Sequence, residues 1–298
     1  MAETYLPVER EEWAGMPATA LTDAAARAPA QPGVYFFAGA DDTLLYVGKA
    51  ANLRRRLADH ARSRPRALGL RESARLGAVC TIRWEICADE EAALLREADL
   101  IVMLRPPFNA SHTEQDPCRY LGVATDSSGL TSFDLLAAPG SPGRVYGCFP
   151  HLAKGAFSHA AKRTKAGYTA LLRLLWAAQS KDPARIPGRI AGASPPTRHR
   201  APVPPELGAV VHDFLSGRSA RVVTALEATL ATTELPDYMR PTLARDVVAA
   251  RDFFELAPRR IRQFRLRYGL PRGPVPADVM AEILSEEVRA AIAEPSTR

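Results

Sequence analysis

Valine, tyrosine and phenylalanine are concentrated in two short stretches, residues 33–37 and 44–47. Between them, Gly39-Ala40-Asp41-Asp42 has the composition of a turn, so the pattern predicts a β-hairpin. If those four residues form the loop, Tyr35 lies directly opposite Tyr46 on the paired strands. Opposite residues share a face, with Cβ atoms about 5 Å apart. We therefore expect two phenol groups side by side on one face of a sheet.

A helix and a third strand are predicted after the hairpin. Asn52 is a suitable N-cap for a helix over residues 53–61, in which apolar residues recur every four positions. Arg56 and His60, also four apart, form a stripe next to that apolar face. Residues 77–87 alternate apolar and polar positions, which predicts a strand.

A second helix is predicted from Asp89 to Leu104, with three acidic residues in its first turn. Glu97 falls in its apolar stripe, three residues after Leu94 and four before Ile101. An unpaired buried carboxylate is costly, so Glu97 should meet an arginine, meet a metal or open into a cleft. The spacing alone leaves a structural ion pair and a functional role equally open.

The rest of the chain reads as short strands and turns over 110–147, a helix over 166–180, and helical apolar stripes over 206–256. Those stripes can serve internal packing or the docking of another protein. Pro183–Pro205 is rich in proline and arginine and is interpreted as a linker. We divide the chain into a lead-in segment at 1–30, a first domain at 31–112, a middle segment at 113–182, a linker at 183–205 and a helical region at 206–298.

The distribution of positive charge along the chain indicates that the protein binds phosphate groups. The chain carries a net charge of +6, and residues 54–75 hold eight arginines against Asp59 and Glu72. A second run, 154–200, has ten Lys or Arg and one acid, Asp182. Arginine concentrated in this way commonly meets nucleic acid, although a solvated basic surface is the alternative.

No stretch is apolar enough for a membrane span, and the amino terminus lacks the pattern of a signal peptide. We expect a soluble, cytoplasmic protein. The four cysteines show no CxxC spacing, so neither zinc nor a disulfide framework is expected.

Phosphodiester hydrolysis needs a proton acceptor, a cation at the phosphate and help for the departing oxygen. A metal on Glu97 and the fixed charge of Arg56 would supply the cations. A tyrosine would act as base only if a neighbouring cation made its phenol more acidic, and a histidine exchanges protons near neutral pH. For the base, the candidates are Tyr35 and Tyr46, with Lys49 or Arg56 as the neighbouring cation. For proton exchange, the candidate is His60. Singly, each residue has a structural interpretation; their combination favours chemistry.

Five ordered motifs resemble the GIY-YIG nuclease domain: Gly33-Val34-Tyr35, Tyr46-Val47-Gly48-Lys49, Asn52-Leu53-Arg54-Arg55-Arg56-Leu57, Glu97-Ala98-Asp99-Leu100-Ile101 and Pro107-Phe108-Asn109. Within this family, the chain resembles the amino-terminal half of the UvrC excinuclease subunit and its shorter relative Cho. Both tripeptides have valine where the family name has isoleucine, which is a conservative change.

The resemblance implies an α+β fold: a small GIY-YIG-type mixed sheet flanked by helices, followed by a mainly helical region. It also implies one Mg²⁺ or Mn²⁺ on Glu97 and direct attack of water on DNA. By the same match the site is lined by Tyr35, Tyr46, Lys49, Arg56, His60 and Asn109, with Tyr35 preferred as the base. Position 60 is often tyrosine in UvrC-like members, so the role of histidine there is less defined. In the basic run, DNA contact is assigned to Arg54, Arg55, Arg62 and Arg64.

The implied function is a DNA endonuclease of nucleotide excision repair. It would hydrolyse one phosphodiester of damaged DNA, on the 3′ side, with a UvrB-like partner locating the damage. The alternatives are a non-catalytic DNA-binding adaptor of a repair complex and a stand-alone structure-specific endonuclease. Beyond residue 120 the likeness weakens: 143–150 and 206–256 resemble UvrC segments, but Arg189–Arg200 stands where many relatives have cysteines. A cysteine-bound cluster and incision on both sides of a lesion are not expected.

Overall fold

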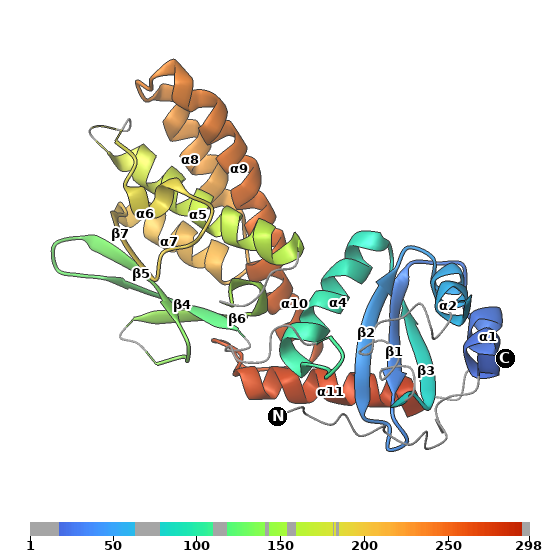
Figure 1. Cartoon of the computed structure of the whole chain (residues 1–298). Helices are drawn as coiled ribbons and strands as arrows, with labels where there is room; N and C mark the ends of the chain where they lie inside the picture. Colours follow the sequence, from blue (N-terminus) through green and yellow to red (C-terminus); the bar gives the residue numbers. More distant parts are fainter. Residues whose placement is uncertain are drawn as a thin grey trace, which may run out of the picture. The chain divides into compact units, whose positions relative to one another are not determined.

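The computed structural model describes residues 18–62, 78–109, 118–140, 143–153, 159–180, 182 and 185–293. The chain divides into two compact units. The first comprises residues 1–101, 105–111 and 285–298; the second comprises 102–104 and 112–284. Helices and two antiparallel sheets confirm the α+β class (Figure 1). In the part that the structure describes, no helix combines the length and the apolar character needed to cross a membrane.

The first unit is built on a three-stranded sheet of order β2-β1-β3. Its described elements are α1 (Ala18–Arg27), β1 (Gly33–Ala38), β2 (Leu44–Ala50), α2 (Leu53–Arg62), β3 (Thr81–Ile86), α4 (Glu90–Leu104) and the carboxy-terminal part of α11 (Ala277–Ala293). Both strand pairs are antiparallel, so the sheet expected to be mixed is antiparallel over these strands. The predicted hairpin, helix, third strand and second helix are all present.

The predicted register of the hairpin is wrong. Tyr35 pairs with Gly48, and Tyr46 pairs with Phe37. The loop is longer than four residues, because the amide of Gly39 bonds the carbonyl of Thr43, and the ladder shifts at Phe37/Ala38. Gly48 leaves room for the ring of Tyr35, since a Cβ atom there would meet that ring. The shift is by two residues, so both tyrosines remain on one face.

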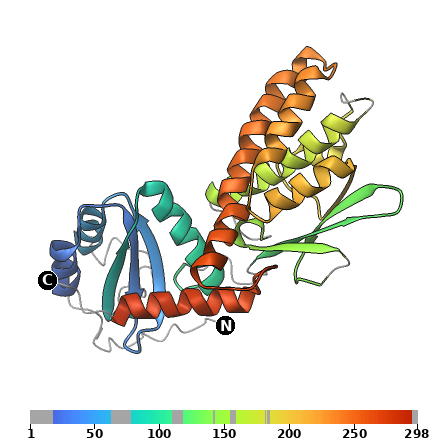
Figure 2. The same ribbon diagram turned by 180° about the vertical axis from the view of Figure 1, so that it is seen from behind.

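Helices lie on the two sides of this sheet, with α1 and α2 on one side and α4 on the other (Figures 1 and 2). The side chains of Tyr35 and Phe37 are buried with Leu53 and Leu57 of α2 and with alanines of α1. The Asn52 side chain caps α2 as predicted, accepting from the amide of Arg55 at 3.0 Å. At the start of α4, Asp89 accepts from the amide of Ala92 at 2.7 Å. These local signals position the elements that carry the site.

The second unit contains a four-stranded antiparallel sheet of order β6-β4-β5-β7, with helices gathered to one side of it (Figures 1 and 2). Its strands are β4 (Arg119–Thr125), β5 (Leu130–Leu136), β6 (Arg144–Phe149) and β7 (Arg198–Pro202). Its helices are α5 (His159–Gln179), α6 (Gly188–Ala191), α7 (Pro205–Leu215), α8 (Arg221–Thr232), α9 (Arg240–Phe254), α10 (Arg260–Arg267) and the start of α11. Short 3₁₀ turns lie at Pro150–Leu152 and Asp237–Met239, and a π-helical turn at Glu255–Arg259 joins α9 to α10.

The segment predicted as a linker is part of the fold. It contains α6, and its β7 forms the edge of the sheet by pairing with β5. In β7, Arg198 and Arg200 alternate with buried His199 and Ala201, so the arginine-rich composition belongs to a half-buried edge strand. A linker at 183–205 is therefore contradicted.

Two ion pairs join α5 to α9 in the same unit. Arg173 binds Asp246 with side-chain exposures of only 12% and 6%, and Arg163 binds Asp252 at 2.9 Å. A boundary at residue 182 would separate α5 from α9. The first 182 residues are thus not a self-contained part of the chain.

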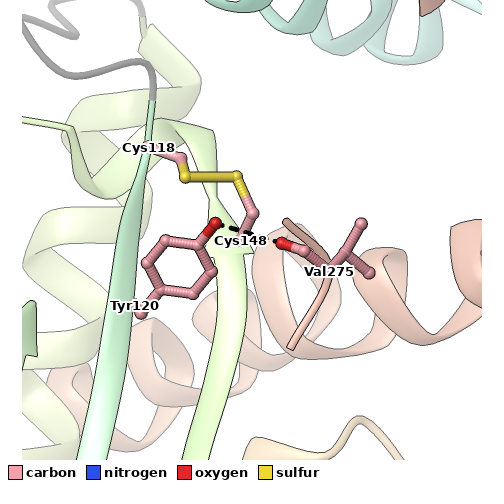
Figure 3. The surroundings of a disulfide bond; sticks show 4 residues. All are labelled: Cys118, Tyr120, Cys148 and Val275. Carbon is pink, nitrogen blue, oxygen red and sulfur yellow. Dashed lines mark hydrogen bonds between the residues drawn. A yellow bond between two sulfur atoms is a disulfide. The ribbon is translucent and has the colours of Figure 1, made fainter. Parts of the chain in front are cut away.

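Two of the cysteines form a disulfide, contrary to expectation. Cys118 and Cys148 join the start of β4 to β6, beside a hydrogen bond from the Tyr120 hydroxyl to the Val275 carbonyl at 3.1 Å (Figure 3). The sequence separation of 30 residues carries no spacing signal, and only strand pairing brings the two thiols together. Cys80 is free and exposed, and Cys87 is free and partly buried.

Candidate active site

Tyr35 and His60 form a buried pair between β1 and α2. The Tyr35 hydroxyl and His60 Nε2 lie 2.8 Å apart, and the two side chains are 0% and 6% exposed. Burial raises the pKa of Tyr35, the charge of Tyr46 adds to the rise, and Arg56 opposes it. Tyr35 is therefore a neutral phenol that shares a hydrogen bond with the adjacent imidazole.

Tyr46 and Arg56 lie beside the Tyr35–His60 pair and are more exposed to solvent than it is. The ring of Tyr46, half-buried on β2, lies 6.0 Å from the ring of Tyr35. Arg56 is exposed on α2 and interacts electrostatically with both tyrosines and with Glu97. The charge of Arg56 thus acts on both phenols and on the carboxylate.

Glu97 reaches the site from α4, on the other side of the sheet. Its Oε1 accepts a hydrogen bond from the backbone amide of Lys49 at 2.9 Å. Burial raises the pKa of Glu97; the Lys49 amide and the charges of Lys49 and Arg56 oppose the rise. The predicted apolar stripe of α4 is shifted by one residue. Ala93 and Leu100 are fully buried, whereas Leu94 and Ile101 are only partly buried. Glu97 keeps its helical spacing to that buried stripe.

Glu97 offers a single carboxylate, which is a ligand type that hard divalent cations accept. Among the described residues there is no group of three His, Cys, Asp or Glu side chains that could hold a metal. Mg²⁺ is commonly bound through one or two carboxylates and keeps several waters. One oxygen of Glu97 is held by an amide, and a cation on the other would offset the cost of its burial.

Lys49 does not turn toward the phenols. Its Nζ forms an ion pair with Glu90 at 2.9 Å, with side-chain exposures of 33% and 60%. An exposed pair of this kind contributes about 0–1 kcal/mol and is easily exchanged for another anion. Sequence reasoning missed Glu90, which lies 41 residues away and has no spacing signal toward Lys49.

Asn109 acts on the backbone of the edge strand. Its side chain accepts from the Val47 amide at 2.8 Å and donates to the Val47 carbonyl at 2.7 Å. The Phe108 amide bonds the carbonyl of Leu45, so the outer edge of β2 is closed by this segment and by Glu97. Exposed edges pair with other chains unless they are covered. Asn109 therefore bonds the backbone of β2 at Val47, between Tyr46 and Lys49 in the sequence.

The arginines assigned to DNA contact differ in their surroundings. Arg54, Arg55 and Arg62 are exposed on α2, while Arg64 lies outside the described residues. Arg54 donates to the Ala28 carbonyl at 2.8 Å, and Arg62 pairs with Asp59. Among the three described arginines, Arg55 is exposed and forms neither kind of contact, although its charge acts on Asp59.

Comparison with known proteins gives matches that all point to one family. Residues 31–110 match the family model described as the UvrC-like GIY-YIG domain. The UvrABC system protein C of Rhodopseudomonas palustris (strain BisB5) is 32% identical over 242 residues, which cover 78% of this chain and 33% of that protein. Excinuclease cho of Escherichia coli (strain K12) is 45% identical over 82 residues, 27% of this chain and 26% of that protein.

The chain spans about a third of the length of the first of these relatives. Among solved structures, it is similar to the GIY-YIG N-terminal endonuclease domain of UvrC from Thermotoga maritima bound to magnesium. That match has 25% identity and a TM-score of 0.27, and it covers 30% of this chain and 97% of the other.

Proposed function

From the UvrC-like GIY-YIG domain that residues 31–110 form, we propose that this chain is a metal-dependent DNA endonuclease that hydrolyses one phosphodiester during nucleotide excision repair. The observation that carries the proposal is the buried Tyr35–His60 pair beside Arg56, whose charge also acts on Glu97. These residues would supply a proton acceptor, a phosphate-binding cation and a metal ligand.

Glu97 would hold one Mg²⁺ or Mn²⁺, which when bound would polarise a phosphoryl oxygen and neutralise developing charge. Arg56 would add a fixed positive charge at the same phosphate. Asn109 would hold β2 in place, so that Tyr46 and Lys49 keep their positions on either face of the strand.

We assign Tyr46 as the group that takes the proton of the attacking water, in place of the Tyr35 favoured by sequence. Tyr35 is 0% exposed, whereas Tyr46 is half-buried and interacts with the Tyr35 hydroxyl. In the tautomer that leaves His60 Nε2 without a proton, water would give its proton to the Tyr46 oxygen, the Tyr46 proton would pass to Tyr35, and the Tyr35 proton would pass to Nε2. No phenolate has to persist, because the imidazole ends with the proton.

Nicking of supercoiled plasmid in Mg²⁺ or Mn²⁺ tests the proposal. Glu97→Gln should abolish nicking. Tyr46→Phe should slow nicking by roughly 10²–10⁴-fold, which is the usual effect of losing a general base. Tyr238→Phe, which removes an exposed hydroxyl of the second unit, is the matched control and should nick normally. Equal nicking by wild type and Glu97→Gln would refute the active site.

Incision on the 3′ side beside damage, with a UvrB-like partner, completes the proposal. A surface for such a partner would include Tyr238, in the 3₁₀ turn before α9, and Val248 of α9, whose side chains are 71% and 59% exposed. Mapping the cleavage site on lesion-containing duplex, with and without UvrA and UvrB proteins, tests this part. Partner-independent cutting at unpaired structures would favour a stand-alone endonuclease, and salt-dependent DNA binding without cutting would favour an adaptor.

A further inference from the structure

The second unit contains a cavity of about 600 Å³ whose wall is rich in arginine. The guanidinium groups come from β6, from the turn after α7, from α10 and from the segment that follows it: Arg144, Arg218, Arg262, Arg265 and Arg272. That last segment is held against β6, because the Val275 amide donates to the Gly147 carbonyl at 2.7 Å. Distant parts of the sequence are thereby fixed around one hollow.

The positive charge of this cavity is only partly compensated. Among the described residues that line it, none is acidic, and the nearby Asp213 pairs with Arg218 at 2.9 Å. The Nε atom of Arg265 is buried and has no hydrogen-bond partner in the described part of the chain. Burial lowers the pKa of Arg265, and the charges of Arg262, Arg272 and Arg218 lower it further. Like charges held together at this cost fit an anionic ligand.

One wall of the cavity separates it from a second hollow. Tyr146 and His212 stand there, with the Tyr146 hydroxyl 2.7 Å from His212 Nδ1. The second hollow, of about 960 Å³, shares Arg144, Tyr146 and His212 and is otherwise lined mainly by apolar side chains and prolines. A cationic recess therefore opens beside an apolar groove with an aromatic ring at the boundary.

We infer that the arginine cavity binds the phosphate groups of a single nucleic-acid strand, with sugars and bases in the adjoining apolar groove. Arginine forks match phosphate oxygens, and the apolar lining of the adjoining groove suits sugars and bases. A recess of this volume admits one strand rather than the broad face of a duplex. Identifying the strand as DNA rests on the proposed nuclease function; the binding of phosphate does not.

The test compares two double variants of the full chain in a Glu97→Gln background with EDTA, so that nothing is cleaved. Arg262→Gln/Arg272→Gln removes two charges from the cavity, and Arg221→Gln/Arg245→Gln removes two exposed charges from α8 and α9. Fluorescence anisotropy measures binding of a short labelled single-stranded oligonucleotide across a salt series. The cavity variant should bind more weakly, with a log–log salt slope smaller by about 1.4, at about 0.7 per lost contact on single strands.

An unchanged slope in the cavity variant, or an equal loss in the control variant, would overturn the inference. So would displacement of the oligonucleotide by polyglutamate as efficiently as by tripolyphosphate, because the site would then be one for acidic peptides. Circular dichroism must show both variants folded. If the wild type fails to nick plasmid while the slopes still differ, the nuclease function fails and the phosphate site stands.

Discussion

Gly48 is the position where one added methyl group should test both the strand register and the site. It lies opposite Tyr35, and a Cβ atom there would clash with both Cζ and the hydroxyl oxygen of that tyrosine. Its backbone is outside the left-handed region, so alanine adds only a steric conflict. Gly48→Ala is therefore a direct perturbation of the Tyr35 ring.

The Tyr35 ring has no free space into which it could move. It is fully buried and packs with Phe37, Leu53 and Leu57 in one apolar cluster. Overpacking of such a site costs about 1–3 kcal/mol. Displacing the hydroxyl from His60 leaves a buried polar group unpaired, at about 1–3 kcal/mol more. A shift of about 1 Å in the site should also slow cleavage roughly 100-fold.

Urea unfolding and plasmid nicking, run on the same preparations, measure the two effects. Gly39→Ala is the control: it lies in the same hairpin, but its added Cβ would meet the nearest atom, an oxygen of Asp41, at an ordinary 3.4 Å. That variant should stay within about 0.5 kcal/mol of wild type and should nick at the normal rate.

A second variant separates the steric effect from a general loss of strand stability. In a Tyr35→Leu background no ring faces position 48, so Gly48→Ala should then cost much less than it does in wild type. Wild-type stability and nicking of Gly48→Ala, or a penalty that persists unchanged in the Tyr35→Leu background, would refute the register and the packing argument.

Three further predictions concern charge and hydrogen bonding. Burial raises the pKa of Glu97, so ionisation of this carboxyl destabilises the metal-free fold as the pH rises through that pKa. Glu97→Gln should therefore raise the Tm at pH 7.5 and leave it unchanged near pH 4. Addition of Mn²⁺ should raise the Tm of the wild type only. Asn109→Asp removes the donor to the Val47 carbonyl and should cost about 1–3 kcal/mol in urea unfolding. Asp246→Ala breaks a buried ion pair and should cost about 3–5 kcal/mol, while Glu227→Ala in an exposed pair should cost less than about 1 kcal/mol.

Each of these has a clear contrary result. A Tm gain of Glu97→Gln that is the same at both pH values would show that the carboxylate charge is not the cause. Unfolding energies of the Asn109 variant equal to wild type would remove its role at the strand edge. Equal losses for the buried and the exposed ion pair would contradict the burial argument.

The sequence alone determined the local elements and the set of candidate residues. The hairpin, the Asn52 cap of α2 and the acidic start of α4 depend on residues within a few positions of one another. The helical spacing of Arg56 and His60 likewise placed them together. Short-range rules suffice for such features because the interacting groups are joined by a few peptide bonds.

Only the tertiary structure decided which of these groups meet across the fold. The space at Gly48 set the hairpin register, and an amide 48 residues away gave Glu97 its hydrogen-bond partner. Asn109 reached Val47 over 62 residues, and the pairing of β4 with β6 joined Cys118 to Cys148. The five arginines of the cavity share no sequence period. Contacts of this range are selected by packing and by the need to satisfy buried polar groups, which no local pattern encodes.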